Sequence, residues 1–311
     1  MKLASWAGLS LLLCGPIALA EAAPGEGQKA VLVTGASTGI GRKITERLAA
    51  DGHFVYAGAR KEQDFAELNA IENVQAIRLD VTKPEDIAAA VATVTQAGRG
   101  LYGLVNNAGV AVTGSFVNTK EEDFDFVMDV NAYGPFRVTK AFAPLIIAAK
   151  GRITTIGSIS GILSAPDLGV YSMSKHAVEA FTDSLAAEMQ AQGVAVSVIE
   201  PGNYNSEIGK SAAERTGQVS RLTDRSKYKS PDEVADAVAL ALFEASPKRR
   251  YLVVPSAYEG EITIRKAIQE LVQLNEGHTY TYDRDALVKM LDEALATARP
   301  AVPLTMERAA P

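Results

Sequence analysis

The chain has little cysteine, little histidine and no long run of basic residues. Its single cysteine, Cys14, cannot form an internal disulfide or a thiolate metal cluster. Its 3 histidines, His53, His176 and His278, lie far apart in the sequence, so we expect no metal site. Lysine and arginine number 31 against 37 aspartates and glutamates, a net charge of −6, which argues against a nucleic-acid surface.

The remaining composition is that of a globular protein. Hydrophobic residues make up 47% and charged residues 22% of the 311 residues, which argues against a disordered, collagen-like or low-complexity chain. This length fits one large α/β domain or two small ones. The sequence has neither an internal repeat nor a second compositional regime, and this favours one domain.

The first 20 residues have the pattern of a secretory signal peptide. Met1 and Lys2 are a short basic start, residues 3–13 are apolar apart from two serines, and small residues follow where a peptidase would cleave. An uncleaved membrane anchor is the alternative, although Pro16 interrupts a stretch that is barely long enough to span a bilayer. We therefore expect a signal-like segment over 1–20 and a linker over 21–28, and a location in the secretory pathway or periplasm, or alternatively the cytoplasm.

The rest of the chain alternates between strand and helix patterns. Such alternation predicts a single-domain Rossmann fold, a doubly wound, parallel, seven-stranded sheet with helices on both faces. We expect this α/β domain over 29–256 and a helical extension over 257–311. The predicted strands are 29–33, 53–57, 74–79, 101–105, 151–157, 194–199 and 251–254. The predicted helices are 40–50, 84–97, 121–131, 133–149, 171–191, 231–243, 259–273 and 284–296, and the polar stretch 203–230 shows no clear period.

A glycine-rich turn, TGASTGIG over 34–41, joins the first predicted strand to the first predicted helix. Free backbone N–H groups and the positive end of a helix at such a turn attract a phosphate. Gly35 would permit the tight turn, Gly39 the close approach of the phosphate, and Gly41 the packing of helix on strand. A plain structural turn is the alternative, but the strand before it and the helix after it favour a dinucleotide site.

The end of the second strand predicts which dinucleotide binds. An acidic residue there binds the adenosine ribose of NAD, whereas a nearby arginine accepts the additional phosphate of NADP. Ala59 cannot bind a hydroxyl, while the guanidinium of Arg60 can hold a phosphate in a bidentate manner. We therefore predict that NADP(H) is preferred over NAD(H). The alternative is that Arg60 and Lys61 lie in a solvated loop.

Tyr171 and Lys175 open the long predicted helix. Residues four apart lie on one helix face, so the phenol and the ammonium can share a site. A nearby ammonium favours the phenolate and would lower the pKa of the tyrosine toward the range of general acid/base catalysis. The spacing alone is a common surface pattern. However, Ser158, Asn107 and Gly109 follow predicted strands at the carboxyl edge where doubly wound sheets bind ligands.

Together these residues resemble the short-chain dehydrogenase/reductase family, in its single-domain branch. The match covers about residues 29–254, in the family's order and spacing. The matching residues are the glycine turn at 34–41, Asp80, the Asn106–Gly109 segment, Asn131, Ser158, Tyr171 with Lys175, and Pro201 with Gly202.

The resemblance implies a role for each matching residue. Tyr171 would be the general acid in carbonyl reduction and the base in alcohol oxidation, and Ser158 would polarise the substrate oxygen. Lys175 would hold the nicotinamide ribose and lower the pKa of Tyr171, and Asn131 would anchor a water that relays protons toward Lys175. With Arg60 added from the strand-end argument, the residues expected to contact the cofactor are Gly35, Ser37, Thr38, Gly39, Ile40, Gly41, Arg60, Asp80, Val81, Asn107, Gly109, Tyr171, Lys175, Pro201, Gly202 and Ser206.

For some of these residues a purely structural role is the alternative, and for others the sequence suggests no role in the site. Asn106 could simply stabilise a strand end, and Asp80 could simply cap a turn. His176 is expected on the helix surface rather than in the catalytic site. Glu200, before Pro201, departs from many relatives, and the sequence assigns it no role.

The expected function is an NADP(H)-dependent oxidoreductase that interconverts a secondary alcohol and a ketone or aldehyde. Apolar Ile162, Leu163 and Leu168 near the site favour a lipophilic small-molecule substrate. The family's mobile substrate loop and helix would correspond to 203–230, with Tyr204, Ile208, Leu222 and Tyr228 as its apolar and aromatic residues. The alternative is a binding protein that senses NADP(H) without turnover. The family also implies a homodimer or homotetramer.

Overall fold

The protein is described by a computed structural model that covers residues 27–217 and 223–297. The signal-like segment 1–20 and nearly all of the linker 21–28 lie outside these residues. The same holds for Leu222 of the expected substrate loop, and for 298–311 at the end of the expected extension.

The predicted α/β sheet is confirmed, because seven parallel strands form one sheet in the order β3-β2-β1-β4-β5-β6-β7. Between β1 and β4 the strand order reverses, which is the place where doubly wound folds bind ligands. The strands are β1 (Ala30–Thr34), β2 (Phe54–Ala59), β3 (Val74–Arg78), β4 (Gly103–Asn106), β5 (Arg152–Ile156), β6 (Ala195–Pro201) and β7 (Arg250–Val253).

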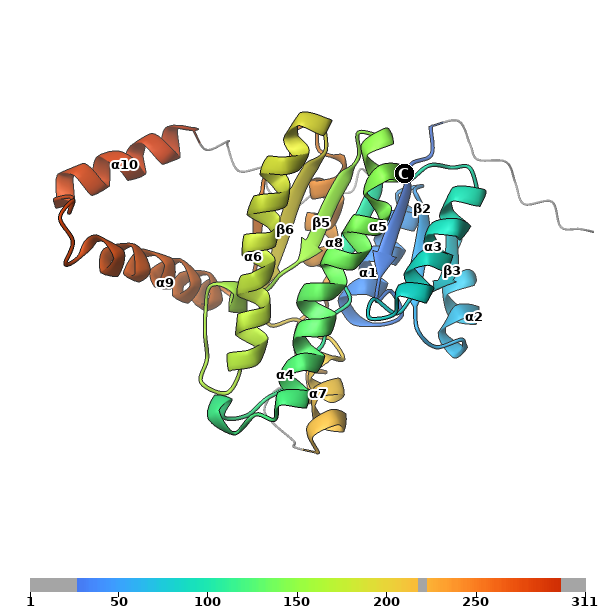
Figure 1. The fold of residues 1–311 in the computed structure, drawn as a ribbon, viewed down its shortest axis with the longest axis horizontal. Coiled ribbons are helices and arrows are strands. Elements are labelled where there is room, and N and C mark those ends of the chain that lie inside the picture. Colours follow the sequence, from blue (N-terminus) through green and yellow to red (C-terminus); the bar gives the residue numbers. More distant parts are fainter. Residues whose placement is uncertain (1–26, 218–222, 298–311) are drawn as a thin grey trace, which may run out of the picture.

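Helices pack on both faces of the sheet (Figure 1). Successive residues of β1 show why: Leu32 faces one apolar cluster and Val33 the other, and both are fully buried. One face is covered by α3 (Pro84–Gln96), α5 (Gly134–Ala148) and α6 (Gly169–Met189). The other face is covered by α1 (Gly39–Ala50), α2 (Gln63–Asn69) and α8 (Asp232–Phe243).

Two helices differ from the periodicity-based expectation. α2 was not expected, since it has seven residues and buries only Leu68. α7 (Ile208–Thr216) lies inside the polar stretch that has no period, where only the resemblance implied a helix, and it buries little besides Gly209 and Ala212. Both are short and mostly polar, so no apolar stripe marks them in the sequence.

The predicted helices 121–131 and 133–149 form one continuous run in the structure. α4 (Glu121–Met128) passes into a π-helical turn, η2 (Asp129–Tyr133), and then into α5. Such π turns commonly occur at functional sites, and this one contains Asn131. Short 3₁₀ turns are η1 (Phe116–Asn118), η3 (Ile159–Gly161) and η4 (Gln190–Gln192).

The two helices expected in the tail are present as α9 (Ala257–Asn275) and α10 (Arg284–Thr297). They extend away from the sheet as an arm, drawn in red at the left of Figure 1. α9 buries only Thr263, and α10 buries no residue. In the described part of the chain, no helix combines the length and the apolar character that crossing a membrane requires.

Candidate active site

A cavity of about 480 Å³ lies at the carboxyl edge of the sheet. The segments that follow β1, β4, β5 and β6 all contribute to its wall, so side chains far apart in sequence meet there. Its size is typical of a pocket for a small molecule or a cofactor. Every predicted site residue except Asn131 lines it.

The glycine turn has the shape that phosphate binding requires. Gly35 has a φ of +65°, and a Cβ there would lie 2.9 Å from the Cα of Ala108. A Cβ on Gly41 would lie 2.2 Å from the carbonyl oxygen of Gly35 and 2.4 Å from Nδ2 of Asn107, so only glycine allows this packing. Thr38 precedes α1 without a side-chain cap, which leaves the first N–H groups of the helix available to a ligand.

At the other end of this wall stand Arg60 and Asp80. Arg60 is exposed at the end of β2 and, within the described residues, forms no ion pair. Asp80 does cap a turn, because its Oδ1 accepts from the backbone N–H of Thr82 at 3.0 Å and from the Thr82 hydroxyl at 2.7 Å. Asp80 still lines the cavity beside Val81, so the turn-capping role and a cofactor contact are compatible.

Asn106 and Asn107, at the end of β4, connect this strand to its neighbours through side-chain hydrogen bonds. Asn107 donates from Nδ2 to the carbonyl oxygens of Thr34 (2.8 Å) and Gly35 (3.0 Å), which ties β4 to the glycine turn. Asn106 donates to Thr139 at 2.9 Å, which ties the end of β4 to α5.

Asn131 lies behind the cavity wall. Its side chain accepts from the Val110 N–H at 2.8 Å and donates to the Val110 carbonyl (2.8 Å) and to the Ser174 hydroxyl (2.9 Å). It is 1% exposed, and both its amide oxygen and its amide nitrogen have hydrogen-bond partners inside the protein. Asn131 therefore links the strand-β4 segment to α6, and its part in a proton relay stays a prediction.

Ser158 and Tyr171 meet at the inner end of the cavity. Ser158 follows β5 and caps η3, where its Oγ accepts from the Ser160 N–H at 3.1 Å. The phenol of Tyr171, from the first turn of α6, lies close enough to Ser158 for that hydroxyl to act on its pKa. Burial raises the pKa of Tyr171 above its usual value, while the Ser158 hydrogen bond and the charge of Arg225 oppose that rise.

Lys175 differs from the sequence-based expectation. Its Nζ donates to the Ile156 carbonyl at 2.8 Å and lies 5.6 Å from the centroid of the Tyr171 ring. Burial lowers the pKa of Lys175 to about 8, with the carboxylate of Glu179 acting in the opposite direction. The expected lowering of the Tyr171 pKa by Lys175 is therefore wrong for this arrangement, because burial of the phenol dominates.

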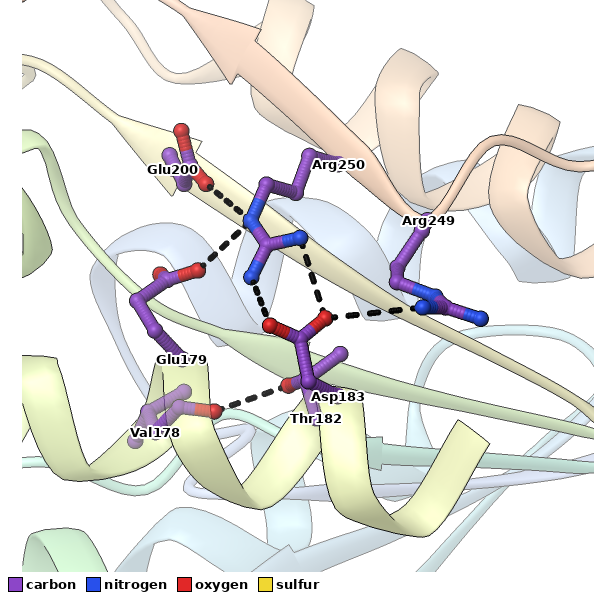
Figure 2. A network of polar contacts seen from close by, with 7 residues as sticks. All are labelled: Val178, Glu179, Thr182, Asp183, Glu200, Arg249 and Arg250. Atoms are coloured by element: carbon purple, nitrogen blue, oxygen red, sulfur yellow. Dashed lines mark hydrogen bonds and ion pairs between the residues drawn. The ribbon is translucent and has the colours of Figure 1, made fainter. Parts of the chain in front are cut away.

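Glu200, to which the sequence assigned no role, belongs to the polar network shown in Figure 2. The Nε of Arg250 lies 3.0 Å from Glu179 and 3.6 Å from Glu200, whose side chain is 3% exposed. Arg250 also forms a bidentate pair with Asp183, at 3.0 and 2.7 Å. Burial and the neighbouring Glu179 raise the pKa of Glu200 to about 7. Figure 2 also shows Arg249 on the far side of Asp183, at 3.7 Å.

The helical extension takes part in the site, whereas the sequence left open whether it reaches the cavity or forms a dimer contact. The carboxylate of Glu259, in the first turn of α9, accepts from the Asn203 N–H at 2.9 Å. A Cβ on Gly202 would lie 2.0 Å from Oε2 of Glu259, so the carboxylate packs directly on the loop after Pro201. The Ser256–Glu259 spacing does signal a helix start, and Ser256 accepts from the Glu259 N–H at 3.3 Å.

Arg225 is the second charged residue that sequence reasoning missed. It lies in the polar stretch before α8 and lines the cavity. No local pattern marks it, since only the folded chain brings it near Tyr171. Tyr204, expected in the substrate loop, lines the cavity but is 1% exposed and packs in the apolar core, and its hydroxyl donates to Glu233 at 2.6 Å. His176 is exposed on α6, as expected.

These residues fit a dinucleotide that carries a nicotinamide. The cavity runs from Arg60 and Asp80, past the uncapped start of α1, to Tyr171 and Lys175. Ser206 lies over the glycine turn, where a Cβ on Gly39 would be 3.3 Å from its Cα, so a phosphate would sit in a narrow backbone cradle. No cluster of three metal-ligating side chains occurs in 27–217 or 223–297.

Comparisons with known proteins agree with this geometry. The family model described as short chain dehydrogenase matches residues 29–217. The mitochondrial D-beta-hydroxybutyrate dehydrogenase of Rattus norvegicus is 37% identical over 291 residues, which cover 90% of this chain and 76% of that protein. Retinol dehydrogenase 7 of Mus musculus is 39% identical over 184 residues, 58% of each protein.

A solved structure is similar as well. The crystal structure of a metagenomic short-chain oxidoreductase in complex with NADP has a TM-score of 0.61 and 30% identity, and covers 73% of this chain and 97% of that one. The match of the family model extends over more than half of the sequence, through the glycine turn, Ser158, Tyr171 and Lys175. The chain therefore belongs to the short-chain dehydrogenase/reductase family of oxidoreductases, which act on CH–OH groups with a nicotinamide cofactor.

Proposed function

We propose that this protein is an NADP(H)-dependent oxidoreductase that interconverts a secondary alcohol and a ketone, or an aldehyde and its alcohol, on a lipophilic substrate. The observation that carries the proposal is that Ser158 and Tyr171 line the same cavity as the glycine turn, with Ser158 close enough to the phenol to act on its pKa. Two hydroxyls directed at one point can both bind the oxygen of a carbonyl or alcohol.

In carbonyl reduction, the substrate oxygen gains negative charge as it becomes an alcohol. Ser158 donates a hydrogen bond to that oxygen, and Tyr171 delivers the proton from its phenol. In alcohol oxidation, the same phenol must first be ionised so that it can accept the proton. The bound nicotinamide supplies or accepts the hydride in the two directions.

Protonation of Tyr171 determines how the rates of reduction and oxidation each depend on pH. Because burial raises its pKa, the phenol stays protonated at neutral pH, which is the state that reduction requires. Lys175, fixed by the Ile156 carbonyl, supplies a positive charge on the same helix face, which favours the phenolate but does not outweigh the burial of the phenol. Its own pKa of about 8 keeps most of that charge at neutral pH.

The preference for NADP(H) rests on Arg60. Its side chain stands at the cavity rim without an ion pair to any described residue, and Ala59 offers no carboxylate to a ribose hydroxyl. A planar guanidinium in this position matches the additional phosphate of NADP. The apolar wall beyond Tyr171 supports the lipophilic substrate, since Leu163, Leu168 and Ile262 line it. One of the relatives is a retinol dehydrogenase, which also favours an apolar substrate body.

Turnover of a panel of alcohols and carbonyls, run with both cofactors, tests the proposal. We expect hydride transfer that falls by at least about 100-fold in Tyr171→Phe, because loss of the general acid/base removes a factor of that size or more. Cofactor binding measured by fluorescence should persist in the same variant. Tight cofactor binding by the wild-type protein without turnover on any member of the panel would favour the sensing alternative.

The predictions about assembly and location remain proposals. A homodimer or homotetramer, an N-terminal membrane tether and a location in the secretory pathway or periplasm are all expectations to be measured. N-terminal sequencing of the natural protein and its mass in solution would decide them.

A further inference from the structure

Arg225 is a charged residue on the substrate side of the cavity. It lies in the segment between α7 and α8 and lines the same cavity as Tyr171. Its Nη2 donates to Oδ1 of Asn203 at 3.0 Å, and its guanidinium carbon lies 5.0 Å from the centroid of the Tyr228 ring. The side chain is thus held by one hydrogen bond and one aromatic contact on the cavity wall.

The positive charge of Arg225 is not matched by a direct anionic partner. Among the residues that the structure describes, no carboxylate forms an ion pair with it, and its buried Nε has no hydrogen-bond partner. Burial lowers the pKa of Arg225, yet a guanidinium keeps its charge in proteins. A desolvated cation of this kind costs free energy unless an anion binds to it.

The orientation of Arg225 is fixed by the helical extension. Asn203 accepts from Arg225 through Oδ1 and donates from Nδ2 to Glu259 at 3.3 Å, so one amide is oriented from both sides. Both carboxylate oxygens of Glu259 are engaged by Asn203, one by its side chain and one by its backbone N–H. Glu259 therefore acts on Arg225 through the amide and leaves the remaining guanidinium donors open.

The surroundings of Arg225 select the chemistry of its ligand. The charged or titratable groups that act on it are Tyr171, Tyr228 and Glu259, of which only Glu259 is a carboxylate. Leu163, Leu168 and Ile262 line the same cavity and supply apolar surface to it. A guanidinium with free donors in such a cavity matches a carboxylate, which it binds in a planar, bidentate manner.

We propose that Arg225 binds a carboxylate on the substrate, so that the substrate is a hydroxy acid or oxo acid with an apolar body rather than a neutral alcohol. This rests on the proposed function, because Tyr171 and Ser158 must bind the reacting oxygen while Arg225 binds the acid group. The cofactor phosphates lie at the glycine turn instead, beside α1 and Arg60.

Matched acid and ester pairs give the test. Straight-chain 2-hydroxy and 3-hydroxy acids of four to eight carbons are assayed beside their methyl esters, with kcat/KM measured in wild type, Arg225→Gln and Arg225→Lys. Lys227→Gln is the control, because it removes the same charge from an exposed neighbour two residues away that does not line the cavity. Melting temperatures confirm that each variant is folded.

We expect the wild type to prefer an acid over its ester by at least about 30-fold, since loss of one member of a desolvated charge pair costs that much or more. The preference should disappear in Arg225→Gln, recover partly in Arg225→Lys and persist in Lys227→Gln. Equal use of acid and ester by the wild type, or an unchanged ratio in Arg225→Gln, would overturn the assignment while leaving the oxidoreductase proposal intact.

A binding measurement decides the point even without turnover. Titration calorimetry of the matched oxo acids and oxo esters compares the same variants with the oxidised cofactor at saturation, so that no hydride can be transferred during the measurement. Binding of an acid that weakens at least about 30-fold in Arg225→Gln supports the assignment. A loss confined to the Kd of the cofactor would show that Arg225 serves the cofactor instead, and would refute it.

Discussion

Glu179 lies one helical turn beyond Lys175, and its carboxylate packs against Gly157, the residue before Ser158. A Cβ on Gly157 would lie 3.2 Å from Oε1 of Glu179, and one on Gly161 would lie 3.0 Å from it. The same carboxylate is held by Arg250 at 3.0 Å. The carboxylate of Glu179 therefore links α6, which also carries Lys175, to the loop of Ser158, and it lies beside the buried carboxyl of Glu200.

Replacing Glu200 by glutamine should change how stability depends on pH. The folded protein holds the proton of Glu200 up to a pKa of about 7, whereas an unfolded glutamate releases it near pH 4.5. The folded state thus binds more protons between these values, so this stabilising contribution is present below pH 4.5 and is lost as the pH rises through 7. Glutamine removes this dependence, and E200Q should gain about 3 kcal/mol relative to wild type between pH 4.5 and 8.

Urea unfolding of both proteins across this pH range measures the difference. Glu188→Gln, at an exposed glutamate of α6, is the matched control, and its difference from wild type should stay constant. A constant difference for Glu200→Gln as well would show that folding does not raise the pKa of Glu200.

Alcohol oxidation and carbonyl reduction should depend on pH differently, because they require Tyr171 in opposite protonation states. Because burial raises the pKa of Tyr171, the phenol required for reduction persists through neutral pH, while the phenolate required for oxidation is scarce. We expect kcat/KM for alcohol oxidation to rise by about tenfold per pH unit from pH 6 to 8, and that for carbonyl reduction to stay level. Initial rates in one buffer series at saturating cofactor measure both, and an oxidation rate that does not change with pH would contradict the assignment of Tyr171.

Gly41→Ala should disrupt the phosphate cradle. Its Cβ would lie 2.2 Å from a backbone oxygen, so the turn between β1 and α1 must shift. We expect a stability loss of about 1–3 kcal/mol from this overpacking and a Kd at least about tenfold higher for NADP(H) and NAD(H) alike. Gly260→Ala in α9 is the control, because its Cβ has ordinary contact with Val254 at 3.6 Å, and alanine there should be neutral or stabilising.

Arg60→Asp tests the choice of cofactor. Loss of a charged hydrogen-bond donor to the phosphate should raise the Kd of NADP(H) by on the order of 10- to 100-fold and spare that of NAD(H). Lys61→Asp makes the same charge change at the next residue, which is exposed and does not line the cavity. Fluorescence titration with both cofactors measures the effect, and an equal loss for both would show that Arg60 does not recognise the phosphate.

Much of the fold is predictable because the buried strands have nearly continuous apolar sequences. Val31, Leu32 and Val33 illustrate this, since each is fully buried between two helical layers. α2 and α7 carry too few apolar residues for their periodicity to show. The π turn at Asp129–Tyr133 depends on packing around Asn131, which no local spacing reveals.

The site was predictable wherever chemistry is tied to a strand end or a helix start. The glycine turn, Ser158, Tyr171 and Lys175 are of this kind. Arg225 and Glu259 were not predictable, because each reaches the cavity only through tertiary contacts with Asn203. The pKa of Tyr171 was misjudged since sequence spacing gives the distance to Lys175 but not the burial of the phenol. The role of Glu200 was also not predictable, because its ion-pair partner Arg250 lies fifty residues further along the chain.

In the arm formed by α9 and α10, the first turn of α9 contacts the active-site loop, whereas α10 packs against nothing that buries its side chains. Glu259 at its root holds the loop beside the nicotinamide end of the cavity, whereas α10 buries no side chain. A dye, an affinity tag or an immobilising surface attached along α10 would thus stand clear of the catalytic groups. The same attachment within the first turn of α9 would reach Asn203 and, through it, Arg225.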